Sequence, residues 1–555
     1  MIGKALRLGG IATALTFSCA HFAIAQSADV ADAIFHNGRI ITVDADFSVA
    51  EAFAVKDGKI LAVGTSAAIQ EMAGDDTHVT DLDGQTVIPG LSDGHLHSVG
   101  GGPGIDLSQT RSMEEFLAQV AAAAKEAGPD DILVSNNDWH EAQLSEQVTP
   151  TADQLEEAAP GIPLVIRRGG HSYFLNHAAL DKWGITKDTP VPAGGSLPKN
   201  DRGELTGEVT NNARTLVPLP PSQPQTLDDL LAEQKVMNSY GLTSVRIPGT
   251  TVSHYRQLIE LRDTDRTSVR YSVLFRNVTP ETLGQENITP DEGDEWVRVW
   301  GIKMGVDGGF EGGHMTKAYE EPRGNGGTYF GLQLLSQEDF NQQVSAWNDG
   351  GWRVTVHGVG DAALDQILDG YEETNKQRSI LDRGWAIEHA FVSRPDQYPR
   401  ARDLNLQLSV QNHLYLAAPT LHGYWGDERA NHVTPLKTYL EEGFLVVGGT
   451  DSAVIPVNPF WVLYHFISRD TISDGVYGED EAISREDALK LLTINYAKMT
   501  GEEKLKGSIE PGKFADFVII SDDYLAIEED EIENLRAVST YVDGVEVYNS
   551  DGTRP

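Results

Sequence analysis

Five side chains that commonly bind divalent metals, and one lysine, recur along this 555-residue sequence. They are His95, His97, Lys303, His357, His389 and Asp451. Neutral imidazole nitrogens and carboxylate oxygens are preferred ligands of Zn²⁺ and similar ions. If the fold brings them together, these residues predict a metal centre able to activate water.

The elements that must position these side chains are eight β-rich runs separated by helix-like segments such as 226–239, 336–348 and 364–375. Strands alternating with helices are typical of an α/β protein and predict a (β/α)8, or TIM, barrel. The six candidate residues close the first, fourth, fifth, sixth and eighth runs, and the C-terminal strand ends of a barrel meet at one mouth. We therefore expect them in one pocket. The runs are residues 87–97, 242–247, 270–275, 297–303, 353–357, 385–389, 406–411 and 444–451.

The barrel is expected to span residues 89–500. Two further parts of the structure are predicted, one from the chain ends and one from a long insertion in the barrel. Short strands and Asp-Gly turns occur near both chain ends, and we expect residues 26–88 and 501–555 to pair into one small composite β-domain. Residues 100–219 are too many for one strand-to-helix connection. They predict an inserted cap subdomain over the barrel mouth.

Residues 1–25 have the pattern of a secretory signal peptide. Lys4 and Arg7 precede an apolar stretch that ends in Ala-Ile-Ala before Gln26. We expect export, to a bacterial periplasm. The one cysteine, Cys19, lies in this segment, so the mature chain would contain no disulfide and no thiol nucleophile.

The charge of the chain excludes some partners. Lys and Arg number 43 against 83 Asp and Glu, a formal net charge of −40. A field of that sign repels phosphate backbones, so we expect no nucleic-acid partner. No basic amphipathic helix indicates a membrane surface. The expected partner is a small-molecule substrate, and a homodimer stays open.

Several motifs together resemble the amidohydrolase superfamily, and within it amidohydrolase family 3, which includes N-substituted formamide deformylase-like proteins. They are His95-Leu96-His97 after Val-Ile-Pro-Gly-Leu at 87–91, the later His357, His389 and Asp451, Gly-Ser-Ile-Glu-Pro-Gly-Lys-Phe-Ala-Asp at 507–516, and Val-His-Gly-Val-Gly-Asp at 356–361. The resemblance covers nearly the whole mature chain.

The resemblance implies a distribution of ligands over one or two metal ions. His95 and His97 would hold the more buried ion with Asp451, and His357 and His389 the more exposed one. Lys303 would be carboxylated by CO2 to a carbamate that bridges the two ions. With Lys303 unmodified, a single ion would be expected.

The resemblance and the residues together predict an exported, metal-dependent hydrolase of a C–N amide-type bond. Asp451 would take a proton from the attacking water and pass it to the leaving group. Ester or lactone cleavage and deamination need nearly the same apparatus and stay open. A different class, a non-catalytic protein that binds metal or a small ligand, stays open too.

Specificity is expected in the cap and in the loops at the mouth. Trp139 is a candidate for stacking on substrate, with cap core as the alternative, and His171 is a candidate hydrogen-bond partner of a substrate carbonyl. Asp307, which follows the fourth run near the presumed mouth, is a third candidate for substrate binding. His413 follows the seventh run and is expected on the rim.

Overall fold

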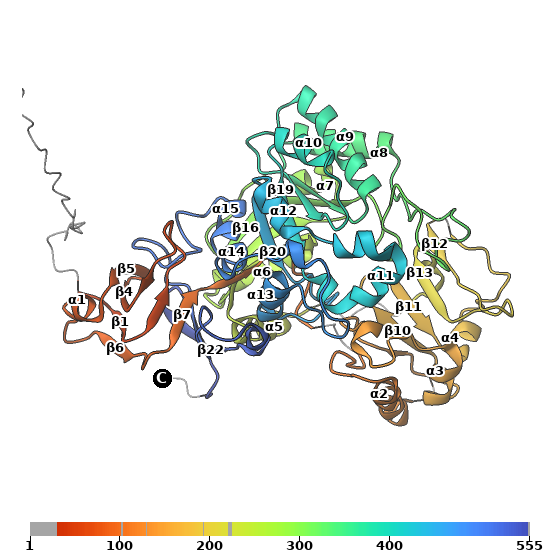
Figure 1. Ribbon diagram of the computed structural model, residues 1–555, viewed down its shortest axis with the longest axis horizontal. Coiled ribbons are helices and arrows are strands. Elements are labelled where there is room, and N and C mark those ends of the chain that lie inside the picture. The colour runs from red at the N-terminus through yellow and green to blue at the C-terminus, as the bar shows by residue number, and fades with distance from the viewer. Residues whose placement is uncertain (1–29, 101–103, 129, 193, 220–224, 553–555) are drawn as a thin grey trace, which may run out of the picture.

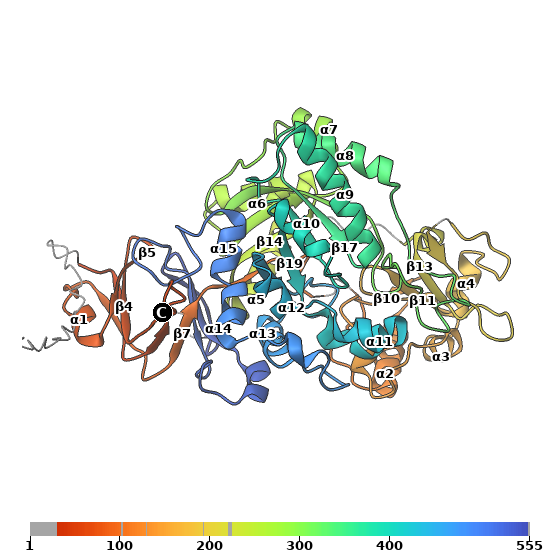
Figure 2. The same cartoon turned by 45° about the horizontal axis from the view of Figure 1, so that its top comes forward.

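The computed structural model describes residues 30–100, 104–128, 130–192, 194–219 and 225–552 (Figure 1). A central barrel has a β-domain on one side and an inserted subdomain on the other, in both views (Figures 1 and 2). The predicted signal peptide, residues 1–25, lies outside these ranges. Within them, no helix combines the length and apolar character needed to cross a membrane.

The barrel is one sheet of eight parallel strands, paired in chain order from β8 to β20. Each predicted run overlaps one of these strands. The predicted α/β class with a TIM barrel is confirmed. The strands are β8 (Leu91–Asp93), β14 (Leu242–Thr250), β15 (Arg270–Phe275), β16 (Val297–Gly305), β17 (Val354–Gly358), β18 (Ala386–His389), β19 (Gln407–Gln411) and β20 (Val446–Gly449).

The barrel closes where β8 meets β20. The Gly94 amide donates to the Gly448 carbonyl at 2.9 Å, and the Thr450 hydroxyl donates to buried Asp93 at 2.6 Å. A side chain at Gly449 would lie 2.5 Å from Asp93 Oδ1, so this close approach requires glycine. Two candidate metal ligands far apart in sequence, one after each strand, therefore become neighbours.

The first predicted run is wrong in one detail, because residues 87–97 do not form one strand. The run divides at Gly90 into β7 (Thr86–Pro89), which belongs to the β-domain, and β8, which belongs to the barrel. A Cβ at Gly90 would lie 2.2 Å from the Thr243 hydroxyl oxygen. The close contact with β14 fixes the point where the chain leaves one sheet for the other.

Strands from both chain ends form the β-domain. The C-terminal strand β21 (Phe517–Ile520) pairs antiparallel with β7, and Phe35 packs against Phe517 with ring centroids 4.9 Å apart. The remaining strands are β1 (Ala33–His36), β2 (Arg39–Ile41), β3 (Val49–Ala50), β4 (Ala52–Lys56), β5 (Lys59–Gly64), β6 (His78–Asp81), β22 (Ala537–Val542) and β23 (Val545–Asn549). The predicted composite domain is confirmed.

Helices surround the barrel, and several bury one face against it, whereas α1 (Ser66–Gln70) packs on the β-domain. In α8 (Gln337–Asp349) the Ser336 side chain caps the first turn, and Phe340, Val344 and Trp347, spaced one turn apart, are buried. The three helix-like segments predicted from the sequence correspond to α5 (Leu227–Ser239), α8 and α9 (Asp361–Gln377). The other helices are α6 (Val252–Asp263), α7 (Pro280–Gln285), α10 (Gln397–Asp403), α11 (His413–Asn431), α12 (Leu436–Glu441), α13 (Pro459–Ser468), α14 (Arg485–Leu491) and α15 (Ile494–Thr500), with 3-10 turns η3 (Glu479–Glu481) and η4 (Glu529–Asn534).

The inserted subdomain lies between β8 and β14 in the chain and has its own sheet, of order β12-β13-β11-β10-β9. It contains α2 (Met113–Glu126), β9 (Leu133–Val134), η1 (Glu141–Gln143), α3 (Ala152–Ala158), β10 (Leu164–Arg168), β11 (Ser172–Leu175), α4 (His177–Lys182), β12 (Gly195–Ser196), β13 (Glu208–Asn211) and η2 (Asn212–Leu216).

A buried ion-pair cluster joins this subdomain to the barrel. Arg168, at the end of β10, donates to Glu141 at 2.5 Å and lies 3.9 Å from Glu311, in the loop after β16. Thr420 of α11 donates to Glu141 as well. Burial alone would raise the pKa of Glu141, but Arg168 and His140 outweigh it and hold the pKa at about 2.

Glu141→Gln is expected to destabilise the protein in a pH-dependent way. A carboxyl with a lowered folded-state pKa stabilises the fold above its unfolded pKa, and this contribution is lost as the pH falls through the folded value. The variant should therefore lose about 1–3 kcal/mol at neutral pH. The difference from wild type should shrink between pH 4.5, the ordinary value, and pH 2. Urea unfolding across this range measures it.

Glu428→Gln, at an exposed position paired with Lys317, is the matched control and should show no such trend. A Glu141→Gln penalty that stays constant down to pH 2 would contradict the assignment of the low pKa to the ion-pair cluster.

Candidate metal centre

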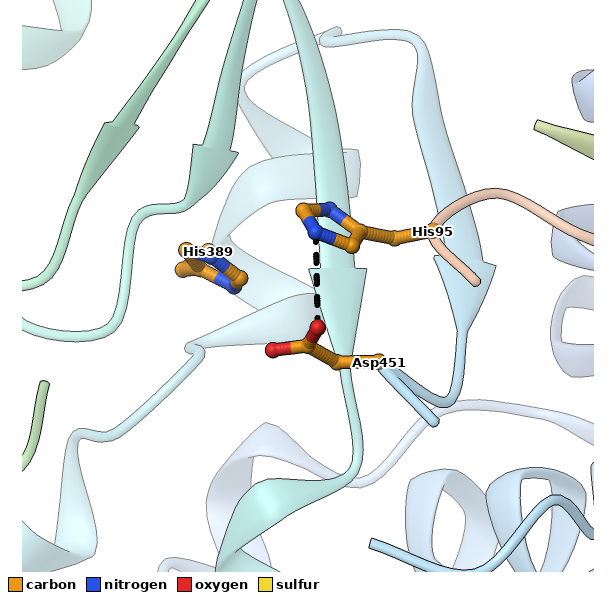
Figure 3. Close-up of side chains that lie close together, drawn as sticks. All are labelled: His95, His389 and Asp451. Atoms are coloured by element: carbon orange, nitrogen blue, oxygen red, sulfur yellow. Dashed lines mark ion pairs between the residues drawn. The ribbon is translucent and has the colours of Figure 1, made fainter. Parts of the chain in front are cut away.

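Three of the predicted ligands converge at the mouth of the barrel. His95, His389 and Asp451 are buried, and each offers a ligand atom within 4.8 Å of the others. Figure 3 shows the three side chains gathered there, and His95 Nε2 lies 3.4 Å from Asp451 Oδ1. They come from the segment after β8, the end of β18 and the segment after β20.

Backbone conformation at two of these residues aims their side chains. His389 has φ of 73° and Asp451 has φ of 60°, in the left-handed region that non-glycine residues seldom adopt. Successive side chains of a regular strand point to opposite faces. Nevertheless the adjacent Glu388 and His389 both contact His95, through a hydrogen bond and through ring packing at 4.8 Å. The left-handed turn at His389 makes this possible.

The hydrogen bonds around the centre leave the donor atoms a cation needs. His95 Nδ1 donates to Glu388 Oε2 at 2.6 Å, and His389 Nδ1 donates to Gln411 Oε1 at 2.6 Å. Each neutral ring then has an unprotonated Nε2. A lone pair on His95 Nε2 facing a carboxylate oxygen is unfavourable unless a cation lies between them. The residues therefore fit a divalent metal ion.

The other three predicted ligands lie around this core. His97 Nε2 is 3.2 Å from Asp451 Oδ1, and Lys303 Nζ is 3.4 Å from His95 Nε2. The His357 ring lies 4.5 Å from that of His389, and its Nε2 donates to the Gly308 carbonyl at 3.1 Å. The structure thus brings all six side chains to one end of the barrel.

Burial controls the ionisation of these groups. It lowers the pKa of His95 to about 3, with Lys303 adding to the effect, and it lowers the pKa of His389 well below the usual range. Burial also lowers the pKa of Lys303 to about 7, although Glu388 acts in the opposite direction. The imidazoles are therefore neutral near pH 7, as metal ligands must be.

The sequence did not indicate the residues that orient the ligands. Glu388 accepts from His95 and from Thr355, and pairs with fully buried Arg246 at 2.6 Å. The position of Glu388 directly before a predicted ligand is the one available signal. Gln411 orients His389, and its place at the end of the seventh run gives a similar signal.

The expected position of His413 is wrong, and the surroundings of Asp307 limit what its side chain can do. His413 is not on the rim: it is buried at the start of α11, and its Nε2 donates to Asp451 Oδ2 at 3.0 Å. Asp307 lines the cavity at the centre, and its carboxylate accepts hydrogen bonds from the amides of His314, Val359 and Gly360 at 2.9 to 3.1 Å. His413 therefore orients the Asp451 carboxylate, and Asp307 connects the loops after β16 and β17.

The other two candidates for substrate binding differ in their surroundings. Trp139 is fully buried, packs against Phe116 at 4.8 Å and donates to the Arg167 carbonyl at 2.6 Å. These contacts favour the cap-core alternative. His171 is half-buried, bonds to Asn211 at 2.9 Å and lies 6.2 Å from the His357 ring.

Two adjoining cavities meet at the centre. The arginine cavity, about 1770 Å³ and open to solvent, is lined by His95, Lys303 and three arginines, Arg167, Arg214 and Arg276. The aromatic cavity, about 530 Å³, is lined by Phe310, Phe391, Val359, Val454 and Ile455. Both are lined by His171, His357, His389 and Asp451.

Comparison with known proteins decides the family. The sequence profile of the amidohydrolase family matches residues 78–548. The chain belongs to the amidohydrolase family. It is therefore a metal-dependent hydrolase of the class that acts on carbon–nitrogen bonds other than peptide bonds.

Individual amidohydrolase relatives match almost end to end. The Arabidopsis thaliana protein LONG AFTER FAR-RED 3 is 30% identical over 94% of this chain and 92% of its own. N-substituted formamide deformylase of Arthrobacter pascens is 27% identical over 94% of this chain and 99% of its own. The crystal structure of an uncharacterized metal-dependent hydrolase from Pyrococcus furiosus has a TM-score of 0.64 and 25% identity, covering 89% of this chain and 99% of that one.

Proposed function

We propose that this amidohydrolase cleaves an amide-type C–N bond of a small molecule at a centre that holds one or two divalent ions, with Zn²⁺ the best match to the ligands. The observation that carries the proposal is the cluster of His95, His389 and Asp451, with donor atoms within 4.8 Å of one another. His97, Lys303 and His357 complete the ligand set. A divalent ion at such a site polarises the substrate carbonyl and lowers the pKa of water.

In this proposal Asp451 acts first as the general base and then as the general acid. Its carboxylate takes a proton as water adds to the carbonyl carbon, and gives it to the nitrogen as the C–N bond breaks, so that the products are a carboxylic acid and an amine. His413 donates to Asp451 Oδ2 at 3.0 Å and so fixes the carboxylate in orientation. Asp451 Oδ1 is left facing the two histidines of the 95–97 segment.

Lys303 has a second proposed role as the carbamate that bridges two ions. Its amine is buried and lies 3.4 Å from His95 Nε2, within a group of metal ligands. An ammonium group would repel a dication there, whereas a carbamate would supply two oxygens and a negative charge. These considerations support two ions; an unmodified lysine would correspond to one.

The alternative reactions, ester or lactone cleavage and deamination, can be distinguished from amide cleavage by their substrates. The name of the Arthrobacter relative, an N-substituted formamide deformylase, supports amide cleavage. Esters, lactones and amino-substituted heterocycles could react at a similar centre, and matched amide and ester substrates distinguish these reactions. Export through the 1–25 segment, with its basic start and Ala-Ile-Ala end, is part of the proposal, and N-terminal sequencing of periplasmic protein tests it.

The first measurement is metal content per chain, by mass spectrometry on protein purified without added metal. We expect about two divalent ions per chain, and loss of at least one in Lys303→Ala. Removal by a chelator should abolish amide hydrolysis, and Zn²⁺ should restore it.

Lys490→Ala, at a surface lysine near Glu486 and Asp487, is the matched control and should keep the wild-type metal content. One ion per wild-type chain would contradict the carbamate bridge. No bound ion, even after addition of Zn²⁺ or Mn²⁺ at neutral pH, would overturn the mechanism.

A further inference from the structure

The walls of the arginine cavity are cationic, although the protein as a whole has a net charge of −40. Arg167, Arg214 and Arg276 line this cavity, and the acids among its described lining residues are Asp307 and Asp451. Asp307 accepts three backbone amides, and Asp451 faces histidines. Within the described ranges, no ion pair joins either carboxylate to Arg214 or Arg276.

Arg276 is the arginine whose charge is least compensated. It directly follows β15, at the same end of the barrel as the metal centre. Its guanidinium makes no ion pair or hydrogen bond with any residue in the described ranges. By contrast, Arg246 and Arg168 each pair with a buried glutamate. An arginine that lines a cavity with all its N–H groups available is suited to receive an anion.

Arg276 lies in the same cavity as residues of the metal centre. It lines this cavity together with Lys303, His357 and His171. Arg214, half-buried in η2, lines this cavity as well. Both arginines therefore border the same space beside the metal ligands.

The aromatic cavity on the other side of the centre has the opposite character. Phe310, Phe391, Val359 and Ile455 give it an apolar wall, and the Phe310 and Phe391 rings lie 5.8 Å apart. These aromatic and branched side chains suit contact with a phenyl ring or a short alkyl chain. A molecule reacting at the centre would thus meet arginines on one side and aromatic rings on the other.

We infer that the substrate is an anionic amide, with a carboxylate bound by Arg276 beside Arg214 and an apolar substituent bound in the aromatic cavity. The scissile position between them rests on the proposed function. The carboxylate site itself does not, because it follows from the unpaired guanidinium and the cavity. Arg276 is therefore a specificity-determining residue.

Direct binding tests the carboxylate site without turnover. Two probe pairs are used, N-benzoylglycine with N-ethylbenzamide and succinanilic acid with butyranilide. In each pair a methyl group replaces the carboxylate, and the two pairs place that group on opposite sides of the amide. Calorimetric titration is carried out on chelator-treated protein, so that a carboxylate cannot bind a metal ion instead of arginine.

We expect at least one acid to bind about 10-fold or more tightly than its methyl analogue, as charge-assisted hydrogen bonds allow. Arg276→Gln should reduce that ratio to below about 3-fold, and Arg276→Lys should restore part of it. Arg266→Gln, a surface arginine paired with Asp228, should keep the wild-type ratio. Added salt should weaken the binding of the acid but not the binding of its methyl analogue. Equal binding of acid and analogue, or discrimination unchanged in Arg276→Gln, would overturn the inference.

Kinetics on Zn²⁺-loaded protein separates this inference from the proposed function. If acid and methyl analogue are both hydrolysed with the same KM and kcat, the proposed function stands and the inference fails. If the acids bind as expected but no amide in either pair is cleaved, the inference stands and amide hydrolysis is in question. For a cleaved acid, Arg276→Gln should raise KM more than it lowers kcat.

Discussion

Asp451→Asn is expected to lower kcat by about 100- to 10,000-fold, the range for loss of a general acid–base group. The amide of asparagine cannot accept the proton of the attacking water, although it keeps nearly the same shape. Asp451 is buried and its two carboxylate oxygens face His97 and His413, so the substitution acts directly at the centre. The measurement is kcat on an amide substrate at saturating Zn²⁺, with the metal content of each sample determined in parallel.

Asp228→Asn, at an exposed aspartate of α5, is the matched control and should retain wild-type kcat. Wild-type turnover in an Asp451→Asn sample with its full metal content would contradict the role of Asp451. If wild type turns over no substrate and the variant keeps its affinity for a small ligand, the protein would instead be a binding protein on the same fold.

Arg246→Met is expected to lower the free energy of unfolding by about 3–5 kcal/mol. The guanidinium of Arg246 is fully buried, pairs with Glu388 at 2.6 Å and stacks 4.1 Å from the Trp300 ring. Removing it leaves the carboxylate of Glu388 buried without its main counter-charge. Urea unfolding of chelator-treated protein at neutral pH measures the loss without a contribution from bound metal.

The double variant Arg246→Met with Glu388→Leu should recover part of this loss, because neither charge then remains buried alone. Arg256→Met, at a half-exposed arginine near Glu286, should change stability by less than about 1 kcal/mol. A single variant as stable as wild type would contradict the importance of the Arg246–Glu388 pair.

The positions of the candidate metal ligands could be predicted from the sequence because they follow from barrel geometry. His357 and His389 end strands whose apolar runs are evident, and parallel strands in a barrel must bring these ends together. The composite β-domain could be predicted for a similar reason, since neither chain end has enough apolar residues for a core of its own. Both predictions needed only local patterns and one topological rule.

Features that depend on exact three-dimensional contacts could not be predicted. The division of the first run at Gly90 depends on contact with Thr243, far along the chain. The burial of His413 depends on packing against Phe391 at 4.9 Å, and on the bond to Asp451. The left-handed conformation of His389, which brings Glu388 and His389 to the same partner, leaves no pattern in the residue types.

The pairing of β7 with β21 has a consequence for the order of folding. Val87 lies opposite Ile519, so β7 has no neighbour on that side until almost the whole chain has been made. Until then β7 is an unpaired edge strand, open to association with other chains. Contacts between such distant segments also form slowly, because a long loop must close first. A chain that stops before β21 would therefore leave this edge exposed, and completion of the C-terminus protects the N-terminal strands from aggregation.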